Sequence, residues 1–277
     1  MRIGFVTCVE LGLACLEEIE GLGGRLNLLV TLDDSVARRK SGRIFLDHYA
    51  ARNSTPLVKT NSINDPGCVA TLKKADLDYL LVIGWSQILK PEVIRTVRRG
   101  IYGMHPTLLP VGRGRAPIPW TILKDLTETG VTAFEIGEGV DNGAIVGQVG
   151  FAVATDETAT SLYAKSVGAH RQLMRELWPR LCQGFVQSTP QDESRATHWD
   201  ARTPQDGEIL PHMSVAEVDR LVRASTRPYP GAFVVIEGVK YLVWAGSLSS
   251  TTPDNELAIA CQDGLFFAQE FEVETSI

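Results

Sequence analysis

Short apolar runs alternate, along the first half of the chain, with longer segments whose apolar residues recur every three or four positions. The runs Ile3–Thr7, Leu26–Leu32 and Leu77–Ile83 have the length and composition of buried strands. Between the first two, apolar residues at helical spacing predict a helix that stops at Gly21–Gly24. This alternation predicts an α/β fold with a doubly wound, mostly parallel Rossmann-like sheet. In such a sheet, ligands bind beyond the carboxyl ends of the strands.

The second half of the chain predicts a long helix, a linker and a small β-rich C-terminal module. Apolar residues from Leu162 to Leu181 fit one helix face, with Thr158 as the N-cap. A polar stretch punctuated by glycine and proline follows. Beyond it we expect a helix over Val215–Ser225 and a pair of strands joined by a tight turn at Glu237–Gly238. The predicted divisions are an α/β domain at 1–182, a linker at 183–206 and the β-rich module at 207–277.

Proline and glycine are concentrated in residues 106–119, directly after a short predicted strand. The residues concerned are Pro106, Pro110, Gly112, Gly114, Pro117 and Pro119. Because such residues interrupt sheets and helices, we expect a long loop that joins neither and faces a cleft. His105 lies where this loop begins, and Asp141 lies between two glycines in a later turn.

A histidine and a carboxylate on neighbouring strand-end loops can share a proton. The carboxylate then orients the imidazole, an arrangement that suits acyl transfer to an amine. Taken alone, His105 is more often explained as a solvated loop residue and Asp141 as a turn former. The residues by themselves therefore leave both interpretations open.

Composition narrows the classes of partner and compartment. A net charge of −6 and a pI of about 5.5 disfavour nucleic acid as a partner. No G-x-G-x-x-G follows the first predicted strand, which disfavours a dinucleotide cofactor. The five cysteines lack metal-ligand spacing, and an apolar run of about 18 residues is missing. We therefore expect no metal site, no membrane span and a cytoplasmic protein with reduced thiols.

Several motifs occur in the order and spacing of the folate-dependent formyltransferase family. They are His105, Leu108–Pro110, Arg113–Gly114, Ala116–Ile118, Thr129–Thr132 and the turn Gly139-x-Asp141-x-Gly143. The chain resembles this family, which includes glycinamide ribonucleotide, methionyl-tRNA and nucleotide-sugar formyltransferases, over roughly residues 1–180. Weaker similarity at Arg202–Gly207 and Arg227–Phe233 resembles the junction and β-module of the two-domain members.

The resemblance implies an N-formyltransferase that uses 10-formyltetrahydrofolate as co-substrate and holds no metal. It implies that His105 assists the proton movements while a primary amine attacks the formyl carbon, and that Asp141 orients His105 and takes part in proton relay. The pterin is expected against the loop Gly84–Leu89 and the turn that contains Asp141. The cofactor-binding residues implied in this way are Trp85, Ser86, Gln87, Ile88, Leu89, Val140 and Asn142.

One position departs from the family pattern. Two residues before the histidine the family has an asparagine, whose amide helps to hold the oxygen of the tetrahedral intermediate, whereas this chain has Gly103. Losing one such donor typically lowers the rate by about 10²–10³. We expect another polar group in that volume: Gln87 is favoured, and Ser86, Thr132, a backbone N–H or an ordered water are the alternatives. Otherwise the protein is a slow enzyme, or it binds folate without turnover.

The acceptor amine is inferred from residues around the predicted site. Arg113 and Arg115, in a Gly-Arg-Gly-Arg turn, have the chemistry to clamp a diphosphate, with Thr107 as a further substrate-binding residue. Arg113 also belongs to the family pattern and is more simply explained as a brace for the loop, so Arg115 is the better pointer. The short, acidic chain disfavours tRNA. We expect a small-molecule amine, a nucleotide-linked amino sugar; methionyl-tRNA and other amines are alternatives, and a homodimer is left open.

Overall fold

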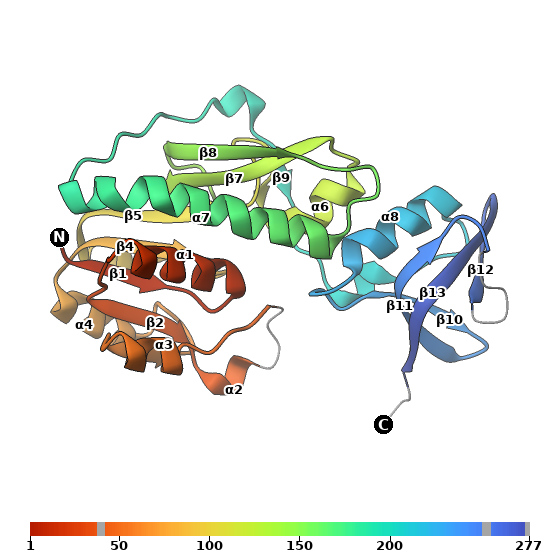
Figure 1. Cartoon of the computed structure of the whole chain (residues 1–277), viewed down its shortest axis with the longest axis horizontal. Coiled ribbons are helices and arrows are strands. Elements are labelled where there is room, and N and C mark those ends of the chain that lie inside the picture. The colour runs from red at the N-terminus through yellow and green to blue at the C-terminus, as the bar shows by residue number, and fades with distance from the viewer. Residues whose placement is uncertain (38–41, 251–255, 275–277) are drawn as a thin grey trace. The chain divides into compact units, whose positions relative to one another are not determined.

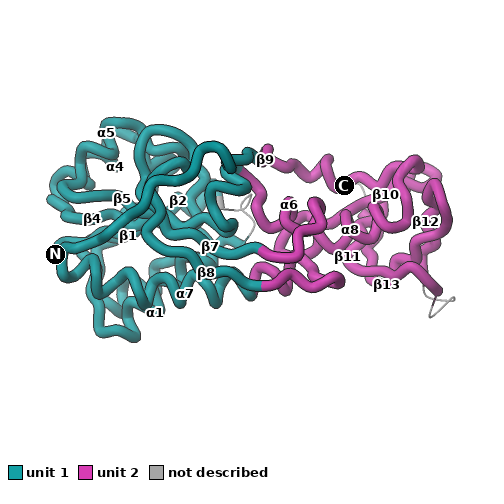
Figure 2. The backbone as a smooth tube through the Cα atoms, turned by 90° about the horizontal axis from the view of Figure 1, so that it is seen from above, with its two compact units in different colours: residues 1–114, 129–151, 165–198 teal, residues 115–128, 152–164, 199–277 magenta. Residues whose placement is uncertain are grey.

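The computed structural model describes residues 1–37, 42–250 and 256–274. The chain forms two compact units, each assembled from several segments (Figure 2). Unit 1, teal in Figure 2, comprises Met1–Gly114, Thr129–Phe151 and Lys165–His198. Unit 2, magenta, comprises Arg115–Glu128, Ala152–Ala164 and Trp199–Ile277. The domain limits that composition suggests, at residues 182 and 206, stay a prediction.

The sheet of unit 1 has seven strands in the order β3-β2-β1-β4-β5-β7-β8. Their bounds are β1 (Ile3–Val6), β2 (Leu28–Leu32), β3 (Leu57–Thr60), β4 (Leu77–Ile83), β5 (Val97–His105), β7 (Glu128–Glu135) and β8 (Ile145–Ala152). The strands from β3 to β5 pair in parallel, and β7 pairs antiparallel with β5. This mostly parallel sheet confirms the predicted fold class. Since β1 has β2 on one side and β4 on the other, the carboxyl ends of β1 and β4 flank the position where such sheets bind ligands.

Helices cover both faces of this sheet, which explains why β4 is an unbroken apolar run (Figure 1). Leu81 and Ile83 belong to a buried cluster with α1 (Glu10–Gly21) and α7 (Ala159–Gln183). Leu80 and Val82 point to the other face and belong to a cluster with α4 (Pro66–Ala75) and α5 (Pro91–Ile94). Two further helices follow β2, namely α2 (Asp34–Ala37) and α3 (Asp47–Arg52).

Unit 2 contains a four-stranded antiparallel sheet with α8 (Val215–Ser225) packed on one face. The strand order is β10-β11-β13-β12, with bounds β10 (Ala232–Ile236), β11 (Val239–Ser247), β12 (Leu257–Cys261) and β13 (Gly264–Glu274). The predicted tight turn joins β10 to β11, and Glu237 and Gly238 have the positive φ angles of 51° and 81° that a primed hairpin turn requires. The small β-rich C-terminal module is thereby confirmed.

One expectation about irregular chain is wrong in part. Within the predicted long loop, Arg113–Gly114 forms β6 and pairs with β9 (His198–Trp199), and Pro117 begins α6 (Pro117–Leu123). Proline interrupts a helix interior but is well suited to its first turn, where the missing N–H has no partner to lose. Residues 183–206, predicted to be a linker, contain β9 and the 3₁₀ helix Glu193–Arg195, and a second 3₁₀ helix, Pro204–Gly207, begins there. Over the described ranges, no helix combines the length and apolar character needed to span a membrane.

A buried histidine in the core of unit 1 makes the stability of the protein depend on pH. His170, on α7, is fully buried, and its Nδ1–H donates to the Ser166 carbonyl at 2.7 Å. Its Nε2 has no hydrogen-bond partner among the described residues. Burial lowers the pKa of His170 to about 4, well below its ordinary value of 6.5. The neutral ring is thus the form that the folded core accommodates.

We predict that this histidine contributes stability that is present above pH 6.5 and is lost as the pH falls towards 4. In that window the unfolded chain binds a proton that the folded core excludes, and the difference amounts to about 3 kcal/mol at most. Denaturant unfolding across this pH range checks it. His170→Leu should remove this part of the pH dependence, and the exposed His48→Gln should keep it. A parallel pH dependence in wild type and His170→Leu would contradict the prediction.

Candidate active site

His105 is the last residue of β5 and is held almost out of contact with water. Along β5, His105 and Gly103 share the sheet face of Ile101, because side chains alternate between the two faces. The side chain of His105 is 9% exposed. Its Nε2 lies 2.7 Å from the carbonyl oxygen of Gly112, and since a carbonyl only accepts, Nε2 carries the hydrogen. The other ring nitrogen, Nδ1, is therefore the one left for chemistry.

Asp141 lies in the turn between β7 and β8, and its carboxylate faces that second nitrogen. The Oδ2 atom is 3.6 Å from Nδ1 of His105 and accepts a hydrogen bond of 2.9 Å from the Gly114 N–H. Asp141 adopts the left-handed region at φ 50°, and a Cβ on Gly143 would lie 1.7 Å from the Glu135 carbonyl oxygen. The turn is therefore tightly constrained, and it brings together the two residues that the sequence pairs.

The route by which Asp141 reaches His105 differs from the expected one. The sequence predicts two neighbouring strand-end loops, but β7 runs antiparallel to β5, so its carboxyl end does not lie at the edge where β5 ends. The residue after β7 instead stays beside β5: the Ile136 N–H donates to the Ile101 carbonyl at 2.7 Å, and the side chain of Ile136 lies against Gly103. A Cβ at Gly103 would lie 2.9 Å from Ile136 Cδ1 and 3.2 Å from Phe134 Cε1.

A Cβ at this position would thus meet apolar side chains first, which disfavours a polar side chain beside it; the polar group expected in place of the family asparagine stays a prediction. The two favoured substitutes are engaged elsewhere. Gln87 Nε2 donates to the Asn61 carbonyl at 2.8 Å, and its Oε1 accepts from the Ile63 N–H at 3.0 Å. The Thr132 hydroxyl donates to the Thr107 carbonyl and accepts from the Leu109 N–H and the Gln148 amide.

Thr107, predicted to bind substrate, is the polar side chain nearest in sequence to His105. It is 1% exposed, and its hydroxyl has no hydrogen-bond partner among the described residues. Leaving a buried hydroxyl unsatisfied costs about 1–3 kcal/mol, so such a group marks a position where a ligand atom would be favourable. Thr107 follows the catalytic histidine candidate by two residues, and its N–H donates to the His105 carbonyl at 2.9 Å.

The loop predicted to hold the pterin follows β4, at the position where the strand order reverses. Gly84 begins it at φ 67°, and a Cβ there would lie 2.1 Å from Val9 Cγ2, so only glycine fits. The Trp85 indole N–H is buried without a partner in the described part of the chain. Ser86 and Ile88 are exposed, whereas Leu89 is buried in the core. In the turn that carries Asp141, Val140 and Asn142 are both exposed.

These features fit a folate. A pterin is a flat ring system with hydrogen-bonding edges, and ligand sites of this kind combine apolar surface with a few polar groups. The loop and the turn provide exposed apolar side chains at Ile88 and Val140, which are 64% and 43% exposed. The orphaned N–H of Trp85 provides a donor. Among the described residues, no group of histidine, cysteine and carboxylate side chains is arranged to hold a metal ion.

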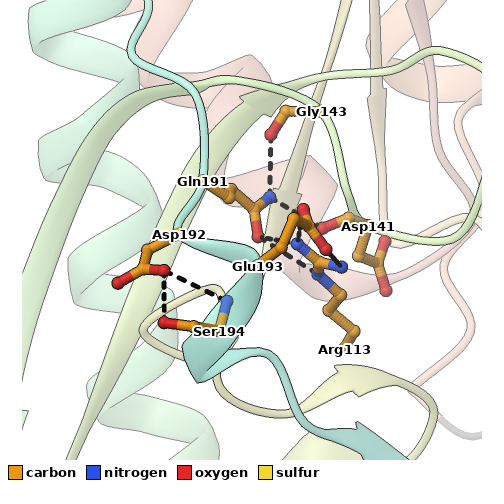
Figure 3. Close-up of polar contacts among 7 residues, drawn as sticks. All are labelled: Arg113, Asp141, Gly143, Gln191, Asp192, Glu193 and Ser194. Carbon is orange, nitrogen blue, oxygen red and sulfur yellow. Dashed lines mark hydrogen bonds and ion pairs between the residues drawn. The ribbon is translucent and has the colours of Figure 1, made fainter.

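The two arginines of the predicted diphosphate clamp have different surroundings. Arg113 is 3% exposed, and its guanidinium makes a two-point ion pair with Glu193 and also donates to Gln191 (Figure 3). These contacts raise the pKa of Arg113, with the hydrogen bond to Glu193 as the main cause. The bracing role weighed for Arg113 matches this geometry. Arg115, in unit 2, is exposed, and its N–H donates to the Trp199 carbonyl at 3.0 Å.

Sequence reasoning missed Gln191, which lies in the predicted linker. Its amide contacts both Arg113 and the turn that holds Asp141 (Figure 3). A polar residue in a polar stretch gives no sign of burial. The available signal was indirect: Arg113 and the turn that contains Asp141 both belong to the family pattern, and each needed a hydrogen-bond partner.

The doubly wound sheet thus carries a buried histidine whose Nδ1 lies 3.6 Å from a carboxylate oxygen, an arrangement with the chemistry to hold a proton. The sequence matches the formyl transferase family over residues 23–177 and the formyl transferase C-terminal domain over residues 202–275. The chain belongs to the formyl transferase family.

Solved structures with the same fold include three informative relatives. A variant of HypX from Aquifex aeolicus has 18% identity and a TM-score of 0.70; the match covers 99% of this chain and 45% of HypX, so the chain spans less than half of that protein. The N-formyltransferase from Helicobacter canadensis, in complex with folinic acid and dTDP-3-aminofucose, has 17% identity and a TM-score of 0.73, with coverage of 97% and 99%. Methionyl-tRNA formyltransferase from Clostridium thermocellum has 17% identity, a TM-score of 0.66 and full coverage of both chains, at 100% each.

We predict that Gly103→Asn destabilises the protein by about 1–3 kcal/mol, because the new side chain must displace Ile136 from a packed position. Denaturant unfolding measures the change. Ile136→Ala opens the volume, so Gly103→Asn should be less destabilising in that background than in the wild type. Equal costs in the two backgrounds would show that Ile136 does not fill the space.

Proposed function

We propose that the protein is an N-formyltransferase that moves the formyl group of 10-formyltetrahydrofolate to the primary amine of a nucleotide-linked amino sugar. The observation that carries this proposal is the distance of 3.6 Å between His105 Nδ1 and Asp141 Oδ2. The other ring nitrogen of His105, Nε2, donates its hydrogen to the Gly112 carbonyl. Membership of the formyl transferase family supports the reaction type. The folate loop, the turn after β7 and Thr107 provide the surrounding surface.

The pair acts on the proton that the amine must lose. Because Nε2 carries the hydrogen donated to Gly112, the neutral ring presents a lone pair at Nδ1. That lone pair faces a carboxylate oxygen, so a proton arriving at Nδ1 turns a repulsive contact into an ion pair. His105 therefore receives the proton of the attacking amine at Nδ1, and Asp141 stabilises it there. The Gly114 N–H fixes the carboxylate for this task.

The co-substrate would be held by the loop after β4 and by the turn that contains Asp141. When bound, 10-formyltetrahydrofolate supplies the electrophilic formyl carbon. In this proposal Trp85, Ser86, Ile88, Val140 and Asn142 form its binding surface, while Leu89, whose side chain is buried, anchors the loop in the core. Gln87 supports this surface indirectly, because its amide hydrogen-bonds the loop to the backbone of Asn61 and Ile63. The N–H of Trp85 is the donor that a pterin edge would satisfy.

A small-molecule acceptor is favoured over tRNA by the surface of unit 2. On the outer face of its sheet, Glu270, Glu272 and Glu274 alternate along β13. Arg227 pairs with the first two and Lys240 with the third, which leaves more acidic than basic groups in this cluster. An RNA-binding surface requires the opposite balance, since phosphate contacts dominate affinity. The bound dTDP-3-aminofucose of the Helicobacter canadensis structure supports a nucleotide sugar as acceptor. Because Arg113 is engaged by Glu193 and Gln191, Arg115 stays the predicted cationic contact for its diphosphate.

The cellular setting forms part of the same proposal. The five cysteines, all within the described residues, form no disulfide with one another, which suits a reducing cytoplasm. Oligomerisation is not needed for the proposed chemistry, because His105, Asp141 and the loop after β4 all come from unit 1 of one chain.

We predict that His105→Gln and Asp141→Asn each lower kcat by about 10²–10⁴, the usual contribution of a positioned acid–base group. The measurement is tetrahydrofolate release from 10-formyltetrahydrofolate with dTDP-linked 3-amino sugars, other small amines and methionyl-tRNA as acceptors. Thermal unfolding of each variant confirms that the fold is kept. Turnover with methionyl-tRNA alone would overturn the sugar acceptor, and thermal stabilisation by folate without any turnover would identify a binding protein.

Thr107 tests whether the orphaned hydroxyl contacts the reacting groups. Thr107→Val removes the hydroxyl at nearly constant volume and should lower kcat/KM by about tenfold, the loss of one neutral hydrogen bond. Thr107→Ser keeps the hydroxyl and should stay within about threefold of the wild type. If Thr107→Val turned over normally, the hydroxyl would have no part in binding or catalysis.

A further inference from the structure

The turn that carries Asp141 is held from outside by a segment more than 40 residues further along the chain, and this support is the subject of a further proposal. Residues 189–199 lie against both loops of the active site. Thr189 exchanges backbone hydrogen bonds with Ile145 at 2.7 and 2.8 Å. Thr197 contacts the loop after His105: its N–H donates to the Pro110 carbonyl, and its hydroxyl accepts from the Gly112 N–H at 2.8 Å.

Gln191 is the centre of this support. It is 9% exposed, and its Nε2 donates to the Asp141 carbonyl at 2.8 Å and to the Gly143 carbonyl at 2.7 Å. Its Oε1 accepts from Nε of Arg113 at 3.1 Å and from Nη2 at 2.8 Å. An amide has two hydrogens to donate and two lone pairs to offer, so every hydrogen-bonding position of this side chain is in use (Figure 3).

Arg113 transmits the same constraint to the other loop. Its guanidinium forms a two-point ion pair with Glu193, at 2.9 and 2.7 Å, which fixes the side chain that Gln191 accepts from. Arg113 stands between Gly112, whose carbonyl receives the His105 hydrogen, and Gly114, whose N–H holds the Asp141 carboxylate. Gln191 thereby links the backbone on both sides of the His105–Asp141 pair.

The position of Asp141 needs such a link. Its φ of 50° is one that residues with side chains rarely adopt, and the surrounding structure must impose it. The two carbonyls that Gln191 binds are those of Asp141 itself and of Gly143. If they were released, the turn would relax and Oδ2 would move relative to Nδ1 of His105.

We propose that Gln191 is a positioning residue for formyl transfer, which holds Asp141 in the geometry that stabilises a proton on His105. This inference rests on the proposed function, because it assigns Gln191 a part in that reaction. A residue that merely stabilises the fold would lower activity independently of Asp141. A positioning residue affects activity only through Asp141, so its substitution should have little further effect on kcat once the Asp141 carboxylate has been removed.

The test is a double-mutant cycle on the full-length chain. Gln191→Met removes the amide at similar volume and should lower kcat by about 10- to 100-fold, as expected for a misplaced catalytic group, with little change in KM for 10-formyltetrahydrofolate. In an Asp141→Asn background, Gln191→Met should have less than about a threefold effect. Gln187→Met, at an exposed position just before this segment, is the matched control and should behave as wild type. Additive effects of the two substitutions would overturn the proposal.

A second readout does not depend on turnover. The ¹⁵N chemical shifts of the His105 ring, measured at one pH, report whether Nδ1 carries a proton. They should move in the same direction in Gln191→Met as in Asp141→Asn; unchanged shifts in Gln191→Met would overturn the positioning role even in an active enzyme. If the wild type showed no formyl transfer, the proposed function would fail, and these shifts would still decide whether Gln191 positions Asp141.

A second variant separates the loss of the hydrogen-bond donor of Gln191 from a loss of the fold. Gln191→Glu keeps the length of the side chain and its acceptance from Arg113, but lacks the NH₂ that holds the carbonyls of Asp141 and Gly143. It should reproduce the loss of kcat and the ring shifts of Gln191→Met. Wild-type values for both in a folded Gln191→Glu protein would overturn the proposal.

Discussion

The hydrogen bond from His105 Nε2 to the Gly112 carbonyl determines which ring nitrogen is available for chemistry. A carbonyl accepts and does not donate, so this contact places the ring hydrogen at Nε2 and directs the lone pair of Nδ1 at Asp141. The carbonyl is in turn fixed by its surroundings: the N–H of Gly112 donates to Thr197, and the next residues pair with β9. The shape of the loop after β5 is thus tied to the protonation pattern of one imidazole.

A second constraint acts on the same face of the sheet, at Gly103. A glycine there lets the side chain of Ile136, on the chain that pairs with β5, pack closely against the strand just before the turn that contains Asp141. The same glycine removes the amide that the family pattern provides beside the histidine. Space for the turn and a hydrogen-bond donor for the intermediate therefore compete for one position in the strand. In this chain the apolar side chains of Ile136 and Phe134 pack against that position. The Thr107 hydroxyl, two residues beyond His105, is a buried polar group without a hydrogen-bond partner among the described residues.

Much of the architecture follows from local sequence patterns. Continuous apolar strands such as Leu77–Ile83, separated by amphipathic helices, indicate a sheet covered on both faces, and the turn at Glu237–Gly238 is recognisable from residue chemistry alone. The strand β13 is harder to recognise because its outward residues alternate glutamates with the apolar inward ones, which lowers its apolar content. Helix α6 is hidden for a different reason: its first residue is a proline, which reads as an interruption.

The candidate site likewise has a part that local sequence patterns predict and a part that depends on long-range contacts. His105 and Asp141 stand out because turn residues surround each of them, and the family pattern supplies their pairing. Local sequence cannot show how the chain after β7 is placed beside β5. That placement involves the contact between Gly103 and Ile136, which are 33 positions apart in the sequence. Gln191 is invisible for the same reason: its partners Asp141 and Arg113 lie 50 and 78 positions away.

Those long separations have a consequence for the order in which the protein folds. All seven strands of this sheet, including β5 with its histidine, lie within residues 1–152. The turn that holds Asp141 gains its outer support only after α7 has crossed the sheet and the chain beyond it has returned to the loop after β5. Contacts of such long range form late, because the chain entropy lost in closing the loop must be offset by native contacts. A nascent chain therefore contains every strand of this sheet before it contains Gln191, which holds the turn of Asp141.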